Sequence, residues 1–186
     1  YKMFKMIVAI SKNRGIGLGN SLPWKLKADM KYFKNTTLGN GNNCVIMGKN
    51  TWDSVDSQKH EPLPKRDKII MSRNNLDITT ANTQSIKNLS ELYAICNKKR
   101  YDDIFVIGGE QIYSMFLEED LVDTVYITEI QNNYECDTFF PRLPNDFYIS
   151  HTTDTVWEND IGYRFTTWRR EEICEPGIIV KGLHAF

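Results

Sequence analysis

Short apolar runs rich in β-branched residues alternate along the chain with segments whose apolar residues recur at helical spacing. Such runs predict strands, because a strand of a parallel sheet is buried on both faces. They are Met6–Ser11, Cys44–Met47, Lys68–Ser72 and Asp103–Ile107. The helical segments are Lys27–Asn35, a stretch from Thr51, the residues after Asn88, and Glu110–Leu117. Strands separated by helices imply crossover connections, and hence a largely parallel sheet covered on both faces.

The segment that begins at Asn88 has the clearest helix signal. Asn88 is suited to the N-cap position, and Glu91 can reach back to complete a capping box. The apolar residues that follow are spaced i, i+3, i+4 and i+7, which places them on one helix face. They are Leu89, Leu92, Tyr93 and Cys96.

The chain between Val122 and Trp168 shows no helical pattern. Val122–Ile130 alternates, with Val125 and Ile127 on one side, and Tyr163–Trp168 predicts a last strand. We therefore expect antiparallel strands at one side of the sheet. The predicted fold class is α/β: a single domain, mostly parallel central sheet of about eight strands with an antiparallel C-terminal part and about four flanking helices. Gly15–Asn20 is predicted to be a flexible loop.

Composition narrows the class of protein. The 186 residues suit one domain, and 23 basic against 24 acidic residues leave a net charge of −1, without the basic excess that nucleic acid or an anionic membrane attracts. We expect no transmembrane helix and no signal peptide. The cysteines are far apart in sequence, which favours reduced thiols in a cytoplasmic protein over disulfides or a metal site. They are Cys44, Cys96, Cys136 and Cys174.

Two strand-to-helix junctions carry glycine where a phosphate group can be bound. In the first, Lys49 and Thr51 follow Gly48; in the second, Gly108 and Gly109 are adjacent. Glycine lets the backbone approach a ligand, and the N–H groups that open the next helix attract an anion. Neither junction is a Walker A or G-x-G-x-x-G motif, and each alone is equally a simple turn. Together they favour a cofactor with a pyrophosphate group.

Ser72 and Arg73 end a predicted strand and suit a phosphate monoester through a hydroxyl and charge-assisted hydrogen bonds. A solvated turn explains the pair equally well.

Asp29 is the carboxylate that stands out, because it lies within a predicted helix beside the apolar residues Met30 and Phe33. A solvated helix face is the ordinary explanation. If Asp29 faces inward instead, burial raises its pKa, and it then suits a ligand with paired N–H donors.

From Phe4 to Arg169 the chain resembles the dihydrofolate reductase family. The matching pieces occur in the order of the family: Ile7–Ala9, Gly15–Gly17, Leu22–Trp24, Asp29 with Phe33, Val45–Trp52, Pro62–Arg66, Met71–Arg73, Val106–Gly109 with Tyr113, Thr128, and Asp137–Pro141. The resemblance implies NADPH-dependent reduction of 7,8-dihydrofolate to 5,6,7,8-tetrahydrofolate, by hydride transfer to pterin C6 and protonation at N5. This reaction supplies one-carbon metabolism and thymidylate synthesis, and antifolates inhibit it.

The resemblance also implies roles for individual residues. Asp29 would hold the pterin 2-amino group and N3, Thr128 would support that carboxylate, and Trp24 would order a nearby water. The proton on N5 comes either from Asp29 through water or from solvent. Residues 12–25 would form a lid over the nicotinamide. The implied catalytic residues are Leu22, Trp24, Asp29, Tyr113 and Thr128.

The ligand-binding residues follow by the same matching. The substrate site comprises Ile7, Val8, Ala9, Asp29, Met30, Phe33, Lys34, Val55, Leu63, Arg66 and Thr128. Arg66 would pair with the glutamate α-carboxylate of folate. The NADPH site comprises Ala9, Ile16, Gly17, Gly48, Lys49, Asn50, Thr51, Ser54, Met71, Ser72, Arg73, Ile107, Gly108, Gly109, Glu110, Gln111, Ile112 and Tyr113. Lys49, Ser72 and Arg73 around the adenosine 2′-phosphate favour NADPH over NADH. The family has a cis Gly–Gly peptide at the second glycine junction.

The sequence departs from the family pattern at a few positions. Asn50 and Gln111 stand where basic residues often occur, and Leu22 replaces methionine in part of the family. We predict a reductase domain at 1–170 and a C-terminal extension at 171–186, which suits a linker stub because the family also occurs fused to thymidylate synthase. Outside such a fusion we expect a monomer. Two alternatives remain: a pyrimidine reductase of riboflavin synthesis, and a non-catalytic pterin-binding protein.

Overall fold

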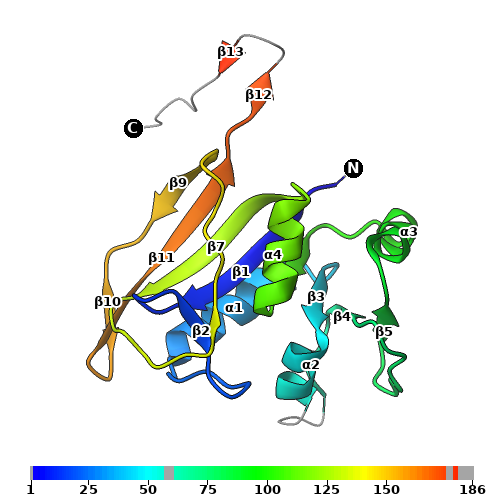
Figure 1. The fold of residues 1–186 in the computed structure, drawn as a ribbon, viewed down its shortest axis with the longest axis horizontal. Coiled ribbons are helices and arrows are strands. Elements are labelled where there is room, and N and C mark those ends of the chain that lie inside the picture. The colour runs from blue at the N-terminus through cyan, green and yellow to red at the C-terminus, as the bar shows by residue number, and fades with distance from the viewer. Residues whose placement is uncertain (1, 57–60, 175–177, 180–186) are drawn as a thin grey trace.

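The apolar runs of the sequence form the parallel part of one central sheet in the computed structural model, which describes residues 2–56, 61–174 and 178–179 (Figure 1). The parallel strands are β1 (Phe4–Ile10), β3 (Cys44–Gly48), β4 (Asp67–Met71), β5 (Thr83–Ile86), β6 (Ile104–Val106) and β7 (Val122–Ile130). The antiparallel strands are β9 (Phe147–Thr152), β10 (Val156–Glu158) and β11 (Ile161–Arg170). The strand order is β10-β11-β7-β1-β6-β3-β4-β5, with β9 also paired to β11.

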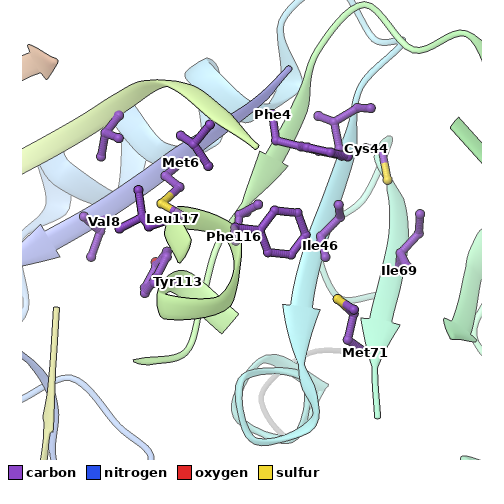
Figure 2. Packing of buried hydrophobic residues seen from close by; sticks show 14 of the residues in the cluster. Phe4, Met6, Val8, Cys44, Ile46, Ile69, Met71, Tyr113, Phe116 and Leu117 are labelled. Carbon is purple, nitrogen blue, oxygen red and sulfur yellow. The ribbon is translucent and has the colours of Figure 1, made fainter. Parts of the chain in front are cut away.

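Four helices of the described residues cover the two faces of this sheet, as the helical spacing predicts. They are α1 (Lys27–Leu38), α2 (Lys49–Asp56), α3 (Leu89–Lys99) and α4 (Glu110–Glu118). Tyr113, Phe116 and Leu117 of α4 pack onto the strands from one side (Figure 2). Phe33 of α1 and Trp52 of α2 pack against a second apolar cluster that contains Val45. The predicted fold class is confirmed.

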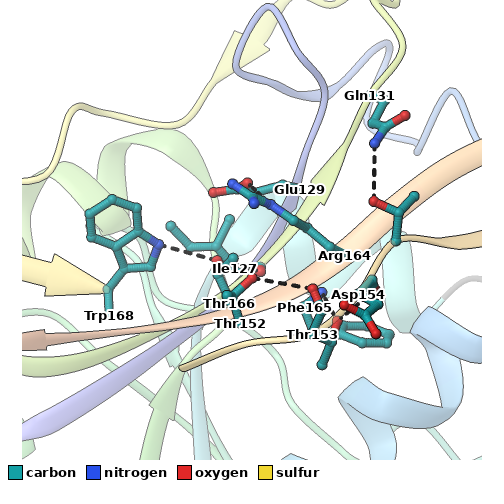
Figure 3. Close-up of polar contacts among 11 residues, drawn as sticks. Ile127, Glu129, Gln131, Thr152, Thr153, Asp154, Arg164, Phe165, Thr166 and Trp168 are labelled. Atoms are coloured by element: carbon teal, nitrogen blue, oxygen red, sulfur yellow. Dashed lines mark hydrogen bonds and ion pairs between the residues drawn. The ribbon is translucent and has the colours of Figure 1, made fainter. Parts of the chain in front are cut away.

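The antiparallel part joins the sheet along β7 (Figure 3). In the pairing of β7 with β11, Glu129 lies opposite Arg164 and accepts its Nε–H at 2.7 Å. Thr128 lies opposite Phe165 on this side and pairs with Ala9 of β1 on the other. Thr128 is therefore in the middle of the sheet, where the parallel and antiparallel parts meet.

The N-cap predicted at Asn88 is confirmed, but Glu91 reaches back to Lys87, one residue before the N-cap, and so does not complete a capping box with Asn88 itself. Asn88 Oδ1 accepts the Glu91 N–H at 3.0 Å, and the Glu91 carboxylate reaches back to the N–H of Lys87 at 2.8 Å. Leu92 is buried, and the other apolar residues predicted for this helix face pack against the same core.

The prediction of a flexible loop at Gly15–Asn20 is wrong for its first three residues. They form strand β2 (Gly15–Gly17), which pairs with β8 (Thr138–Phe139). The partner strand lies more than a hundred residues further along the chain, so the local sequence does not predict this strand pairing. A side chain at position 15 would collide with Cys136, since its Cβ would lie 2.2 Å from the cysteine Sγ.

Part of the predicted C-terminal extension forms a hairpin of β12 (Ile173–Cys174) and β13 (Ile178–Ile179), which stands away from the central sheet in Figure 1. The rest of 171–186, apart from Glu171 and Glu172, lies outside the described residues. The boundary at residue 170 stays a prediction.

The described part of the chain holds no helix that combines the length and apolarity needed to cross a bilayer. Within the same residues, histidine, cysteine and carboxylate side chains do not gather in threes as a metal site requires.

Candidate active site

Asp29 occupies the third position of α1 and turns toward the sheet. The Thr128 hydroxyl donates a hydrogen bond of 2.6 Å to Asp29 Oδ1, and the Asp29 side chain is partly buried. Burial raises the pKa of Asp29, the hydrogen bond from Thr128 opposes that rise, and the negative charge of Glu158 adds to it. The inward-facing interpretation is thus correct, and the solvated-face alternative is wrong.

The Asp29 carboxylate takes part in no ion pair among the described residues. A carboxylate without a cation, held by one hydroxyl on one oxygen, suits a ligand that brings its own N–H donors. Paired donors can then satisfy both carboxylate oxygens.

Trp24 supplies a second unsatisfied polar group. Its indole packs with Leu26, Ile130 and Tyr163, and Ala9 borders the same cluster. The Trp24 Nε1–H is buried and has no hydrogen-bond partner in the part of the chain that the structure describes. Because buried N–H groups are nearly always paired, this donor suits a water or a ligand atom.

The two predicted glycine junctions meet at the carboxyl edge of the sheet. The Gly48 N–H donates to the Gly108 carbonyl oxygen at 2.8 Å, and β3 pairs directly with β6. A Cβ at position 48 would lie 3.1 Å from Ile112 Cγ1, and Gly108 has a φ of +122°, which disfavours any side chain there. Helices α2 and α4 begin directly after these glycines, so the N-termini of both helices lie at the same edge of the sheet. The Gly108–Gly109 peptide is cis, as the resemblance implied.

The ends of the neighbouring strands lie beside the two glycine junctions, so that several segments suited to ligand binding form a row along the sheet edge. The order β1, β6, β3, β4 brings the ends of these strands to one edge. Along it lie Ala9, the pair Gly108–Gly109, the segment Gly48–Thr51, and the pair Ser72–Arg73. Such a row suits an extended ligand with phosphate groups near its middle and at one end.

Comparison with known proteins gives the family. The model of the dihydrofolate reductase family matches residues 3–170. A dihydrofolate reductase of Aedes albopictus is 31% identical over 186 residues, covering 91% of this chain and 98% of the relative. One of Candida albicans is 35% identical over 190 residues, covering 89% and 96%. This chain belongs to the dihydrofolate reductase family.

Some family members are longer. A bifunctional dihydrofolate reductase-thymidylate synthase of Daucus carota is 38% identical over 180 residues, covering 91% of this chain but 34% of the relative. The chain thus spans about a third of the length of the bifunctional relatives that it matches. These matches favour a dihydrofolate reductase over the pyrimidine reductase alternative.

Several of the residues expected to bind the family cofactor lie along the row, whereas Ile16 and Gly17 lie in β2, and three contacts among the expected residues are notable. Lys49 forms an ion pair of 2.6 Å with Asp53, both exposed, and the Glu110 carboxylate accepts the Phe139 N–H at 3.1 Å. The Tyr113 hydroxyl is buried and donates to the Ile7 carbonyl at 2.9 Å. Tyr113 therefore holds β1 in place beside Gly108. The cofactor-binding roles of all the expected residues stay predictions, those of Asn50, Ser54, Met71 and Gln111 included.

The residues expected to line the folate site divide between the two faces of the sheet. Phe33, Val55 and Leu63 are partly buried against the cluster of Ile7. The side chain of Val8 packs on the opposite face, against the cluster of α4, so Val8 can line this site only through its main chain. Met30 and Leu22 are 53% and 54% exposed, and Lys34 is exposed. Their roles, and that of Ile16 in β2, stay predictions.

Arg66 is buried, yet its guanidinium meets no carboxylate among the described residues. Its Nη1 donates to the Thr37 hydroxyl at 2.9 Å, and its Nε donates to the Pro64 carbonyl at 3.1 Å. Burial lowers the pKa of Arg66, because the charged form loses hydration. A ligand carboxylate would relieve that cost, which agrees with the predicted glutamate contact.

Sequence reasoning missed Glu158 of β10. Its carboxylate accepts N–H groups at the start of α1, the helix that carries Asp29. Glu158 is followed by Asn159 and Asp160, a pair that favours a tight hairpin turn, but nothing local links this hairpin to α1.

Proposed function

We propose that this chain reduces 7,8-dihydrofolate to 5,6,7,8-tetrahydrofolate with NADPH. One observation carries the proposal: a partly buried carboxylate, Asp29, is held by Thr128 beside Ala9 at one end of a row of glycine junctions and basic residues. Family membership supplies the reaction class, and this arrangement supports Asp29 as the acid that binds the pterin and the row as the edge that binds the dinucleotide.

The site residues suit NADPH in shape and charge. Gly48, Gly108 and Gly109 leave space for the pyrophosphate at two helix N-termini, and Thr51 Oγ1 would lie only 3.7 Å from a Cβ at position 109. Lys49, Ser72 and Arg73 would hold the 2′-phosphate. When bound, the reduced nicotinamide supplies the hydride that pterin C6 receives.

The chain's own residues would bind the pterin and deliver a proton to its N5 atom. Asp29 accepts the 2-amino and N3–H groups, and Thr128 keeps the carboxylate facing them. Because burial raises the pKa of Asp29, the carboxyl group is better able to carry a proton near neutral pH than an exposed aspartate. The Trp24 N–H would hold a water between this carboxyl and N5, so that the proton reaches N5 as C6 accepts the hydride.

An absorbance assay tests the proposal. We expect purified protein to oxidise NADPH when dihydrofolate is added, to use NADH less well, and to stop when methotrexate is present. Absence of dihydrofolate-dependent oxidation, in protein that binds NADPH, would favour the non-catalytic alternative.

Replacing Thr128 with valine tests the support of Asp29. The hydrogen bond from Thr128 lowers the pKa of Asp29, so Thr128→Val should raise it and move the alkaline limb of the rate profile to higher pH. The maximal rate should fall about five- to tenfold, since the net value of such a bond is about 1 kcal/mol. Steady-state rates measured across pH check both effects.

Thr124→Val is the matched control for that variant. Thr124 is also buried on β7, but its hydroxyl bonds Asp123 rather than Asp29. An unchanged profile in Thr128→Val, or an equal change in both variants, would contradict the assigned role.

A further inference from the structure

Helix α1 begins without a cap of its own. Leu26 occupies its N-cap position and offers no side-chain acceptor. The first N–H groups of a helix have no partner within the helix, so another group must accept them. Here Glu158 does so, from 131 residues further along the chain. Its Oε2 accepts the Lys27 N–H at 2.6 Å, and its Oε1 accepts the Ala28 N–H at 3.2 Å.

The hairpin of β10 and β11 fixes that carboxylate in place (Figure 1). Glu158 pairs with Ile161 across the turn, and both turn residues, Asn159 and Asp160, have positive φ values of 49° and 62°. The Tyr163 hydroxyl on β11 donates to Glu158 Oε1 at 3.4 Å. Tyr163 also packs in the cluster of Trp24 and Leu26, which leads into α1. The acceptor is therefore held by the same side chains that surround the start of the helix.

Glu158 and Asp29 compete for one electrostatic feature, the positive N-terminal end of α1. An acid in the first turn of a helix is normally stabilised in its charged form by that end. Glu158 already neutralises it, because two N–H groups bind its carboxylate, and these bonds lower the pKa of Glu158. The charge of Glu158 in turn raises the pKa of Asp29.

Among the residues that the structure describes, no cation offsets this effect at Asp29. The groups that act on it from neighbouring elements are Thr128 on β7 and Glu158 on β10, and its own charge acts on Tyr32 of α1 and Tyr163 of β11. None of the four can carry a positive charge.

We propose that Glu158 is a positioning residue for the reaction: it fixes the first turn of α1 and neutralises the end of the helix that carries Asp29. The catalytic consequence rests on the proposed function, whereas the effect on Asp29 itself does not.

The test compares Glu158→Gln with Asp160→Asn. The first variant keeps one amide oxygen as acceptor and loses the charge. The second removes a charge from the same hairpin at an exposed residue, and asparagine tolerates its positive φ. The ¹³C signal of the Asp29 carboxyl carbon is followed against pH in protein without ligands, and urea denaturation confirms that each variant is folded.

We expect the titration midpoint of Asp29 to move to lower pH in Glu158→Gln and to stay in place in Asp160→Asn. On the alkaline limb of the profile, kcat/KM for dihydrofolate should fall about two- to fivefold in Glu158→Gln, the range of a helix-end interaction. At acid pH, where Asp29 is protonated in both proteins, the two rates should converge. An unmoved midpoint in folded Glu158→Gln overturns the proposal.

Glu158→Asp covers the case in which the glutamine variant does not fold. It retains the negative charge of residue 158, so the Asp29 midpoint should stay at that of Asp160→Asn and of the unchanged protein. A midpoint in Glu158→Asp lower than in Asp160→Asn also overturns the proposal. If the unchanged protein does not reduce dihydrofolate, the proposed function fails, and the carboxyl titration still decides the role of Glu158.

Discussion

Asp29→Asn should lower turnover of dihydrofolate at neutral pH by about 10²–10⁴-fold, the range over which a general acid contributes. Asparagine has nearly the shape of aspartate, so the fold and the glycine junctions are preserved. It presents an amide in place of a carboxyl group, and can neither carry the proton nor accept two N–H donors. Steady-state rates and NADPH binding, measured on the same preparation, check this result.

Binding of NADPH should be retained in Asp29→Asn, because the cofactor row is formed by other residues. Loss of NADPH binding together with turnover would point to a general defect. Full activity of the variant would remove Asp29 from the mechanism altogether.

The same variant should be more stable than the unchanged protein at neutral pH. Folding raises the pKa of Asp29, so the folded protein favours the protonated form. For such a group, stability is greatest below the unfolded pKa and is lost as pH rises through the folded pKa. Asp29→Asn removes the group that must ionise in a partly buried place. Urea denaturation at pH 7 should show a higher midpoint for the variant, and the difference should shrink in acid.

Arg66→Gln should raise KM for dihydrofolate about 10- to 100-fold, with a smaller effect on kcat. The expected contact with the glutamate α-carboxylate is a charge-assisted bidentate pair, and hydrogen bonds to charged groups contribute about 1.5–3 kcal/mol each. The pteridine ring lies at the other end of the substrate, so its chemistry should change little. Initial rates over a range of dihydrofolate concentrations check the split.

Dihydropteroate provides the matched control on the substrate side, because it has the same ring and no glutamate. Its KM should be nearly equal in Arg66→Gln and in the unchanged protein. An equal rise for both substrates would mean that Arg66 acts through Thr37 and the fold of α1 rather than on the carboxylate. Arg66→Lys should lie between the two proteins, since lysine keeps the charge but not the fork of donors.

Periodicity was sufficient for the parallel half of the sheet, because buried strands and amphipathic helices each leave a local pattern. It was insufficient for β5, in which two of four residues are exposed, and for β9, in which most are exposed; no apolar run marks either strand. It was also insufficient for β2, which pairs with the distant strand β8. These elements depend on contacts between distant segments, which no window of the sequence contains.

The site was predictable to a similar extent. Glycine after a strand indicated Gly48 and Gly108, and an acid in an apolar helix indicated Asp29. The support of Asp29 by Thr128 was predicted from the family resemblance alone, because the local sequence does not distinguish Thr128 from other threonines in strands. Glu158 was missed because its hydrogen-bond partners are main-chain N–H groups at the start of α1. Such groups do not depend on the side chain, so the residue types there do not indicate the contact.

The Asp29–Thr128 contact is made at β7, the strand at which the parallel and antiparallel parts of the sheet are joined. The acid comes from a helix near the start of the chain, its hydroxyl partner from the last parallel strand, and the helix cap from the hairpin beyond. The proposed site of proton delivery is thus assembled only when segments 99 and 131 residues apart in the chain have come together. We expect a partly folded chain in which only the dinucleotide-binding edge is complete to bind the cofactor without catalysing the reduction.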